Sequence, residues 1–403
     1  MRILLLIWTL FFCSAFATSS CVSEGQNGNG RPSVSAARRS VKKVPIEIPI
    51  TNQLYVQARI NGSALMWFVV DTGSTWTFLD ATKAKELNIA TEGSRTVETG
   101  EVHALTMTFA RDTTLEISGV KVPIQELAVM PLKFRHAPQL VGIIGSDLFE
   151  RFVVEIDYAA RSLELFEPND YAYKGPGEIL TMEVIEKIPH IVVNISRGSV
   201  NLVPAKLLVD TGAAQSVVLY APFVETNKLL ETTTGTILIT AGGLGGGSLM
   251  RKVRAKVVKI GRLTFDRPLI YFAPQKRSAG WRDGILGNDL LDRFKVIIDY
   301  SRRKVILEPS ARLNAPTDFS SYQFNLIREG KRYKVAEIVE GGIAGEAGLR
   351  TGDVLTSVNG NSVSDLSLFE TQRLFLMDGQ DRVLSVKRGD QTLEIKLRSF
   401  RID

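Results

Sequence analysis

Cysteine and histidine are scarce in this chain of 403 residues, and their positions exclude several kinds of site. Both cysteines, Cys13 and Cys21, lie within the first 21 residues, so no disulfide, cysteine zinc site or catalytic thiol is expected in the rest of the chain. The three histidines, His103, His136 and His190, lie far apart and show no metal-ligand spacing. The sequence therefore predicts neither a metal nor another cofactor.

A strong charge of one sign and a long hydrophobic run are also missing. The formal net charge is +6, but the basic residues are spread thinly, and the one local basic run, at 38–43, lies in a segment rich in glycine, serine and asparagine. We interpret that run as a solvated linker, with a role at a membrane surface or in processing as the alternative, and we expect no nucleic-acid partner. The apolar run Ile3–Phe12 is too short to span a bilayer.

The first residues have the charged start, short apolar core and small-residue exit of a secretory signal, which we place at 1–20. Two interpretations stay open here. Cleavage after Ala17 would release a soluble protein, whereas Thr18–Cys21 resembles a loose bacterial lipoprotein box in which an acylated Cys21 would be the only membrane contact. Both predict an exported protein, periplasmic, anchored in an outer membrane or secreted, with a polar linker or pro-segment at 21–44.

One short stretch occurs twice. Residues 71–73 read Asp-Thr-Gly directly after an apolar run, and residues 210–212 repeat this tripeptide in the same context. Each copy is followed by an apolar-apolar-glycine segment, which ends at Gly145 in the first half and at Gly287 in the second. The two aspartates are 139 residues apart and the two glycines 142, so the halves stay almost in register. This is an internal duplication, and two facing units could bring both carboxylates to one axis.

The pattern around each copy predicts strands joined by tight turns. In the first half, apolar segments at 55–60 and 65–70 flank an Asn-Gly turn; in the second, segments at 191–195 and 205–209 flank a turn at 197–201. The fold class is therefore mainly β. Short helices are expected at 81–87, at 222–230 and around Leu148 and Leu290.

Each half also contains a candidate flap, a hairpin that could project over a cleft. The first is Thr96–Leu105, turning at Gly100, and the second is Ile239–Leu249, turning through a glycine run that includes Gly243 and Gly245. A phosphate-binding loop is the alternative for the glycine run, but no strand-loop-helix context and no Gly-Lys-Ser/Thr follow it. We favour a flap, because a lid that closes on substrate needs a flexible backbone.

The pattern changes after a proline-containing break at 310–318. Beyond it, the sequence predicts a strand at Tyr333–Val339, an amphipathic helix at Asp365–Leu376, and a closing pair of strands at 382–387 and 392–397.

The paired Asp-Thr-Gly motifs, each with its apolar-apolar-glycine partner, resemble the two-lobed aspartic proteases of the pepsin and retropepsin kind. The second motif continues into alanine, which is more similar to the bacterial retropepsin-like group than to pepsin proper. The segment 344–360 is similar to a PDZ domain of the bacterial protease-associated type. The resemblance implies two homologous β-barrel lobes facing across a cleft, at 45–170 and 171–309, then a linker at 310–320 and a small α/β PDZ domain at 321–403.

The resemblance assigns catalysis to Asp71 and Asp210. Two carboxylates held about 3 Å apart cannot both ionise, so they would share one proton. The ionised one would activate water and the protonated one would donate to the developing oxyanion, which is the chemistry of an aspartic endopeptidase acting on peptides or unfolded proteins. The resemblance gives supporting roles to Thr72 and Thr211 as an interlobe grip, to Gly73 and Gly212 in close substrate approach, to Ser74 and Ala213 as flanking residues, and to Gly145 and Gly287 behind the dyad.

Two departures from the family pattern stand out. Ala213 occupies a position where many pepsins have serine or threonine, while the first half keeps Ser74. Losing a hydroxyl that can bind the charged form should raise the pKa of the dyad, which predicts activity at higher pH than a gastric enzyme tolerates. Neither candidate flap contains tyrosine, so the flap tyrosine of pepsins has no counterpart.

Four other repeated aspartates receive structural interpretations. Asp147 and Asp289 are expected to cap the short helices that follow them. Asp157 and Asp299 precede Tyr and a basic turn, which is typical of hairpin turns.

For the tail, we predict capture of a C-terminal peptide ligand by strand addition, in a groove between Tyr333–Val339 and the helix at Asp365–Leu376, with a carboxylate-binding loop at 330–332. Packing against the protease without any ligand is the alternative. Two rival functions remain: a catalytically inactive exported protein that binds peptides in the cleft and the PDZ groove, and a PDZ-bearing serine protease. The second lacks a Gly-x-Ser-x-Gly nucleophile setting.

Overall fold

The computed structural model describes most of the chain from Lys42 onward, and the statements below apply to that part. The described residues are 42–48, 53–98, 104–132, 134, 139–196, 201–230, 236–243, 246–274, 282–314, 324–330, 332–338, 342–366, 371, 374–375 and 380–398. The predicted signal, the predicted linker up to residue 41, the flap tips at Gly100 and Gly245, and most of the helix predicted at 365–376 lie outside these residues. Within them, no helix is long and apolar enough to cross a membrane.

The fold is mainly β, as predicted, and its two halves contain equivalent sheets. The first-lobe sheet consists, in spatial order, of β5 (Glu92–Glu98), β6 (Ala104–Ala110), β9 (Leu127–Met130), β4 (Phe78–Asp80), β10 (Leu140–Ile144), β3 (Met66–Val70), β2 (Leu54–Ile60), β7 (Thr113–Ile117) and β8 (Val120–Ile124). The second-lobe sheet consists of β18 (Ile237–Gly243), β19 (Gly246–Arg254), β22 (Leu269–Ala273), β17 (Val217–Tyr220), β23 (Gly284–Leu286), β16 (Val203–Val209), β15 (Ile188–Ser196), β20 (Val257–Ile260) and β21 (Leu263–Asp266), with β14 (Glu183–Ile185) paired to β15. The two spatial orders match strand for strand, so the sequence duplication is a structural duplication.

The turn between β2 and β3 illustrates how the sequence forms these sheets. Asn61 and Gly62 adopt the left-handed backbone region, with φ of 50° and 74°, which is the geometry that a two-residue hairpin requires. Along the paired strands, alternate side chains enter the main core, as in β7, where buried and half-buried residues alternate. The predicted strands at 55–60, 65–70, 191–195 and 205–209 are all present.

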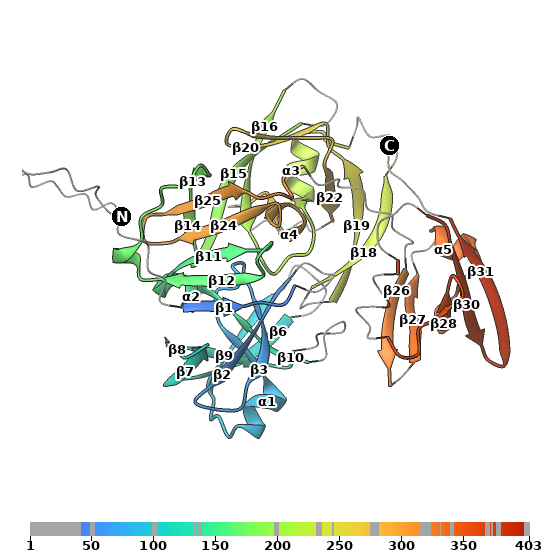
Figure 1. Ribbon diagram of the computed structural model, residues 1–403, viewed down its shortest axis with the longest axis horizontal. Coiled ribbons are helices and arrows are strands. Elements are labelled where there is room, and N and C mark those ends of the chain that lie inside the picture. The colour runs from blue at the N-terminus through green and yellow to red at the C-terminus, as the bar shows by residue number, and fades with distance from the viewer. Residues whose placement is uncertain are drawn as a thin grey trace, which may run out of the picture. The chain divides into compact units, whose positions relative to one another are not determined.

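A third sheet joins the halves (Figure 1). Its spatial order is β1 (Lys42–Pro45), β12 (Ser162–Phe166), β11 (Val153–Asp157), β24 (Phe294–Asp299), β25 (Lys304–Pro309) and β13 (Glu178–Thr181). The equivalent strands β11 and β24 pair antiparallel at its centre, with Ile156 opposite Val296. The duplicated segments therefore bind each other directly, which the sequence pattern did not predict. The first described strand, β1, ends at Pro45, where the first lobe was predicted to begin.

The helices are short. They are α1 (Ala81–Glu86), α2 (Ser146–Arg151), η1 (Pro168–Asp170), α3 (Ala221–Thr226), α4 (Asn288–Leu291) and α5 (Ile343–Glu346). Asp80 caps α1 by accepting hydrogen bonds from two backbone N–H groups. The capping role predicted for Asp147 and Asp289 is wrong: both lie inside the first turn, behind the cap residues Gly145 and Gly287, which have no side chain to bind the helix.

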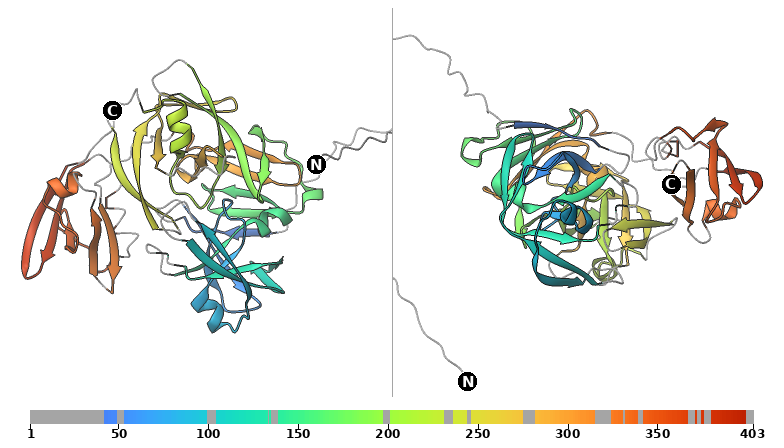
Figure 2. Two further views of the ribbon diagram at one scale, coloured as in Figure 1. Left: turned by 180° about the vertical axis from the view of Figure 1, so that it is seen from behind. Right: turned by 90° about the horizontal axis from the view of Figure 1, so that it is seen from below.

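Both predicted flaps are antiparallel hairpins over their described residues. In the first, β5 pairs with β6; in the second, β18 pairs with β19 until Gly243 lies opposite Gly246. The longer β18–β19 ribbon is clear in the left-hand view of Figure 2.

The C-terminal part forms a separate sheet with its own core. Its strands are β26 (Phe324–Glu329), β27 (Arg332–Ile338), β28 (Val354–Val358), β30 (Arg382–Arg388) and β31 (Gln391–Leu397), with β29 (Asn361–Ser362) paired to β28. The groove predicted beside Tyr333–Val339 is wrong, because β27 lies between β26 and β28 and both of its edges are used. The edge strand on that side of the sheet is β26, which carries Phe324 in edge-to-face contact with Phe375.

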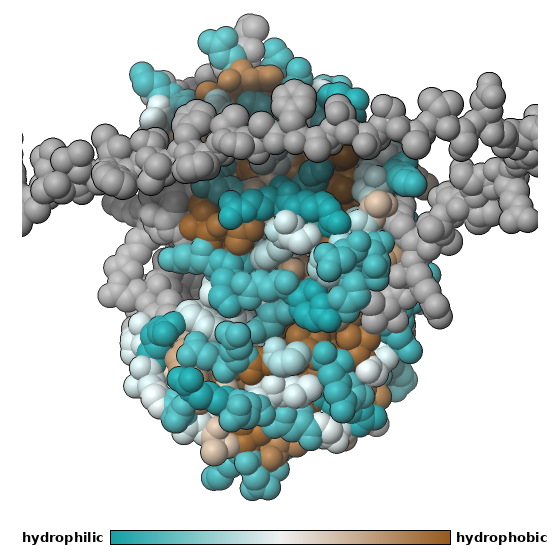
Figure 3. All heavy atoms as spheres, turned by 90° about the vertical axis from the view of Figure 1, so that its left-hand side faces the viewer, coloured by the Kyte–Doolittle hydropathy of each residue, from teal (hydrophilic) through white to brown (hydrophobic). Residues whose placement is uncertain are grey.

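Exposed large apolar side chains are scattered over separate elements of the described chain. They are Leu65, Ile179, Val192, Leu230 and Leu249. On the face shown in Figure 3, hydrophilic residues predominate and the hydrophobic ones are interspersed among them.

Candidate active site

The two Asp-Thr-Gly motifs lie at equivalent strand ends. Asp71 follows β3 and Asp210 follows β16, and each is held from behind by a parallel neighbour: the N–H of Asp71 donates to Ile144 O (2.9 Å) and the N–H of Asp210 to Leu286 O (2.9 Å). These neighbours lead into the glycines that the sequence singled out. A methyl group built on Gly145 would lie 2.2 Å from the carbonyl oxygen of Trp76, which leaves no room for a side chain.

A reciprocal hydrogen-bond grip joins the two motifs beneath the aspartates. The Thr72 hydroxyl donates to Val209 O (2.6 Å) and accepts from the N–H of Thr211 (3.0 Å). The Thr211 hydroxyl donates to Val70 O (2.9 Å) and accepts from the N–H of Thr72 (3.1 Å). Both threonines are fully buried, so these four bonds fix one lobe to the other in a place without competing water.

The grip brings the two carboxyl groups into hydrogen-bond contact with each other. The neighbouring glycines pack directly on the opposite carboxyl. A methyl group on Gly212 would lie 2.4 Å from Cγ of Asp71, and one on Gly73 would lie 2.8 Å from Cγ of Asp210. The structure thus brings together the two carboxylates, both glycines and both threonines predicted from the repeat.

The surroundings make the two carboxyls unequal. Burial, and then the charge of Asp210 and the hydrogen bond to it, raise the pKa of Asp71 well above its usual range. Burial also raises the pKa of Asp210, but the hydrogen bond from Asp71, two backbone N–H groups and the charge of Arg282 oppose this rise. Asp210 accepts from the N–H of Gly212 (2.8 Å) and of Ala213 (3.1 Å), and Asp71 accepts from the N–H of Gly73 (2.7 Å). A backbone hydrogen bond from Gly212 also lowers the pKa of Asp71, so backbone donors act on both carboxyls. The pKa of Asp71 is therefore raised further above its usual range than the pKa of Asp210.

The predicted effect of the Ser74 and Ala213 difference needs correction. The hydroxyl of Ser74 donates to Trp76 O (2.8 Å) and not to the carboxyl of Asp71. An alanine in the second lobe consequently removes no hydroxyl bond of the kind assumed. The high pKa of the pair comes from burial and from the mutual contact of the carboxyls.

Two contacts near the dyad were missed by sequence reasoning. Tyr158 donates to Asn288 Oδ1 (2.7 Å), and Asn288 donates to Thr211 O (2.6 Å), so the first half supports the second motif through a buried chain. Gln53 donates from Nε2 to Gly212 O (2.7 Å) across 159 residues of sequence. Only the repeated Asp-Tyr pair was a signal for the first contact; nothing in the sequence marked Gln53.

The other repeated aspartates stabilise local structure. Asp147 accepts from the N–H and the hydroxyl of Thr77, at 3.1 and 2.7 Å. Asp157 and Asp299 accept from backbone N–H groups of the turns that follow them, in line with the hairpin interpretation.

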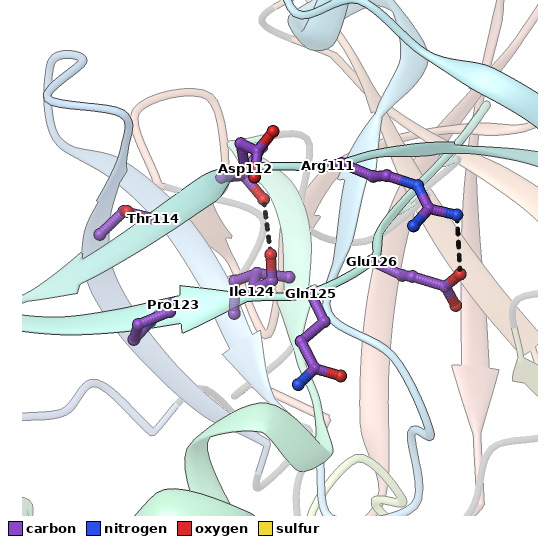
Figure 4. Close-up of a pocket in the computed structure, with 8 residues that line it drawn as sticks. Arg111, Asp112, Thr114, Pro123, Ile124, Gln125 and Glu126 are labelled. Carbon is purple, nitrogen blue, oxygen red and sulfur yellow. Dashed lines mark hydrogen bonds and ion pairs between the residues drawn. The ribbon is translucent and has the colours of Figure 1, made fainter.

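A hollow of about 570 Å³ lies elsewhere on the first lobe (Figure 4). Its lining includes Arg111, which forms ion pairs with Glu92 (2.5 Å) and Glu126 (3.9 Å) at the surface. None of the residues that line it belongs to the two aspartate loops.

Comparison with known proteins finds family matches for the duplicated part of the chain and for its C-terminal part. Residues 56–148 and 196–290 match the family model described as aspartyl protease, one match in each half, and residues 334–388 match the model of the PDZ domain. Among solved structures, the chain is similar to the aspartic proteinase from Irpex lacteus, with 17% identity, a TM-score of 0.44, and coverage of 68% of this chain and 98% of that one. No curated protein matches the sequence. The resemblance inferred from the repeated motifs is thereby confirmed: the chain is similar to the aspartyl proteases in both halves and carries a PDZ domain after them.

Proposed function

We propose that this protein is an aspartic endopeptidase in which Asp71 and Asp210 share one proton and activate water. The observation that carries the proposal is the contact between the two carboxyl groups, held by the reciprocal bonds of Thr72 and Thr211. In this mechanism Asp210 is the base, because the charge of Arg282 lowers its pKa and because the pKa of Asp71 is raised further above its usual range. Asp71 is the acid.

The reaction then follows from these roles. Asp210 takes a proton from a water molecule bound between the carboxyls, and the resulting nucleophile attacks the carbonyl carbon of the substrate peptide bond. Asp71 gives its proton to the developing oxyanion, so that charge never accumulates in a poorly solvated site. Proton return and transfer to the leaving nitrogen complete hydrolysis without a covalent intermediate.

The PDZ domain is proposed to recruit or regulate substrate. Strand addition requires a free sheet edge, and among the described strands β26 lies at the edge of this sheet, where Phe324 contacts Phe375. A C-terminal peptide segment is the ligand that this mode of binding would take. We also propose that the protein is exported, on the basis of the N-terminal sequence, as a periplasmic, lipid-anchored or secreted form.

The test is cleavage-site mapping by mass spectrometry in a denatured protein mixture. Asp71→Asn and Asp210→Asn keep the shape of the dyad but remove its acid-base chemistry. We expect cuts with the wild type that are absent with both variants. Identical patterns from all three proteins would refute the enzyme and would favour the peptide-binding alternative.

A further inference from the structure

The duplication allows the two sides of the candidate cleft to be compared position by position. Across the first-lobe sheet, one row of directly paired residues, here the first-lobe wall, consists of Phe109, Ala128, Phe78, Ile143, Val69 and Tyr55. Across the second-lobe sheet, the equivalent row, the second-lobe wall, consists of Lys252, Tyr271, Val218, Ile285, Leu208 and His190.

Both walls lie on the sheet face that carries the aspartates. Successive strand residues point to opposite faces, so Asp71 shares its face with Val69, and Asp210 shares its face with Leu208. Their neighbours Val70 and Val209 enter the main core on the other side. The walls therefore extend from the dyad in opposite directions, one on each lobe.

The walls differ in charge. The first-lobe wall and the residues packed with it form an apolar, aromatic cluster that includes Leu140 and Trp76. In the second lobe, three basic residues replace apolar or aromatic ones. The strand register places Lys252 at the position of Phe109 and His190 at that of Tyr55. Arg282 lies just before β23, and by sequence count it corresponds to Leu140, since it is two residues before Gly284 as Leu140 is two residues before Gly142.

Of these three basic residues, Arg282 is the least buried. Lys252 and His190 are fully buried and have acidic neighbours, Asp289 and Glu183 respectively. Burial lowers the pKa of Lys252 to about 7 and that of His190 to about 4, so both lose charge easily. Arg282 is only half-buried and keeps its charge.

Two observations locate the guanidinium of Arg282. Its guanidinium carbon lies 5.7 Å from the ring centroid of Tyr220, which belongs to the apolar cluster of the second-lobe wall. Its charge also acts on Asp210, whose pKa it lowers. The guanidinium thus lies on the wall and close to the dyad.

We propose that Arg282 is a specificity-determining residue that binds an acidic side chain of the substrate next to the bond that is cut. This inference rests on the proposed function. Because the duplication relates the two walls across the dyad, residues on opposite sides of the scissile bond contact different lobes. The preferred substrate therefore has a bulky apolar residue against the first-lobe wall and Asp or Glu, on one fixed side of the cut, against the second.

The experiment combines library profiling with matched peptides. First, cut sites of the wild type in a peptide library are aligned, and we expect acidic residues to be enriched on one side of the cut. Second, peptides that differ only by Glu or Gln at that position are compared. A charge-assisted hydrogen bond predicts that kcat/KM is on the order of ten-fold higher for the Glu peptide near neutral pH.

The variants then test the residue itself. Arg282→Leu installs the residue of the first-lobe position and should bring the Glu-to-Gln ratio to about one, while Arg282→Lys should keep part of it. Arg111→Leu, on the distant hollow, is the matched control and should leave the ratio unchanged. If Arg282→Leu does not fold, the Glu-to-Gln ratio of the wild type still tests the proposal. That ratio must fall to about one as the pH drops below the Glu pKa of about 4.3, because the protonated side chain has no charge for Arg282 to bind.

The outcomes separate the two proposals. Absence of any cut that Asp210→Asn lacks would refute the peptidase itself. Cleavage without acidic enrichment, a Glu-to-Gln ratio that persists in Arg282→Leu, or a ratio that survives protonation of Glu would refute the role of Arg282 and leave the peptidase standing.

Discussion

The hydrogen-bond grip beneath the dyad gives the sharpest test of how the lobes are held together. Thr72→Val keeps the volume of the side chain but removes its hydroxyl, which leaves Val209 O and the N–H of Thr211 buried without that partner. Each of these two buried polar groups costs about 1 to 3 kcal/mol when it loses its bond, so we expect the free energy of unfolding to decrease by about 2 to 6 kcal/mol. Thr72→Ser keeps the hydroxyl and loses one methyl group, for about 1 kcal/mol.

Urea denaturation followed by tryptophan fluorescence measures this difference. All four tryptophans, at 8, 67, 76 and 281, precede the PDZ domain, so the signal reports on the protease part of the full chain. Peptidase activity should fall much further than stability, on the order of 100-fold in kcat, because a shift of about 1 Å between the carboxyls disrupts their alignment. Equal unfolding midpoints for Thr72→Val and Thr72→Ser would refute this reasoning.

Three further predictions concern the dyad and the PDZ domain. Gly212→Ala should abolish peptidase activity, because the added methyl group would lie 2.4 Å from Cγ of Asp71. Gly73→Ala should reduce activity less, because its methyl group would lie 2.8 Å from Cγ of Asp210. Initial rates on one peptide give the order of the two variants, and the reverse order would contradict this prediction. Folding raises the pKa of Asp71, so the folded state keeps a proton that the unfolded chain releases above about pH 3.9. The stability of the folded state therefore decreases as the pH rises above that value. The melting temperature of Asp71→Asn should therefore decrease less than that of the wild type between pH 4 and 7, and parallel curves would count against the assignment. Burial raises the pKa of Asp353, but the ion pair with Arg388 (2.7 Å) opposes this effect and the net pKa is lowered. The stability that the ion pair provides is therefore lost as the pH falls through the pKa of Asp353 in the folded state. Asp353→Asn should accordingly speed hydrogen exchange in the PDZ domain while cleavage of short peptides is unchanged; exchange equal to the wild type would argue against a stabilising pair.

Most features of the fold and of the candidate site that the sequence predicted followed from the internal repeat. Two copies of a strand ending in Asp-Thr-Gly are local patterns, and β-branched runs, an Asn-Gly turn and capping residues such as Asp80 determine local structure. The strands around both motifs, the first helix and the hairpins of both candidate flaps followed from these signals. The identity of the pair Asp71 and Asp210 followed from the duplication, because equivalent segments of facing units must meet near one axis.

Contacts between distant segments could not be predicted in the same way. Gln53 donates to Gly212 O, yet its immediate sequence contains no pattern that implies a partner 159 residues away. The PDZ groove was assigned to the wrong strand because sequence shows that a segment is a strand but not whether its edges are free. The sequence pattern suggested Asp147 as a helix cap, but the cap residue is Gly145, two residues earlier, and the carboxylate of Asp147 binds Thr77 instead.

The register of the two walls shows where the halves could diverge. The middle positions of both walls are aliphatic: Val69 pairs with Ile143, and Leu208 pairs with Ile285. Each pair joins the strand that carries an aspartate to the strand that supports it, where a polar side chain would lose water without gaining a partner. At the two ends of its row the second lobe carries His190 and Lys252, which are fully buried but have the acidic neighbours Glu183 and Asp289.

That divergence also makes the dyad asymmetric. Arg282 lowers the pKa of Asp210, which supports the proposed role of Asp210 as the base. Removing this charge in Arg282→Leu should raise the pKa of Asp210. Because the base must be ionised, the acid limb of the pH profile of kcat/KM should then move to higher pH, even for a peptide without acidic residues. A profile that stays in place would mean that the hydrogen bond from Asp71 and the backbone donors of Gly212 and Ala213 keep Asp210 ionised without Arg282.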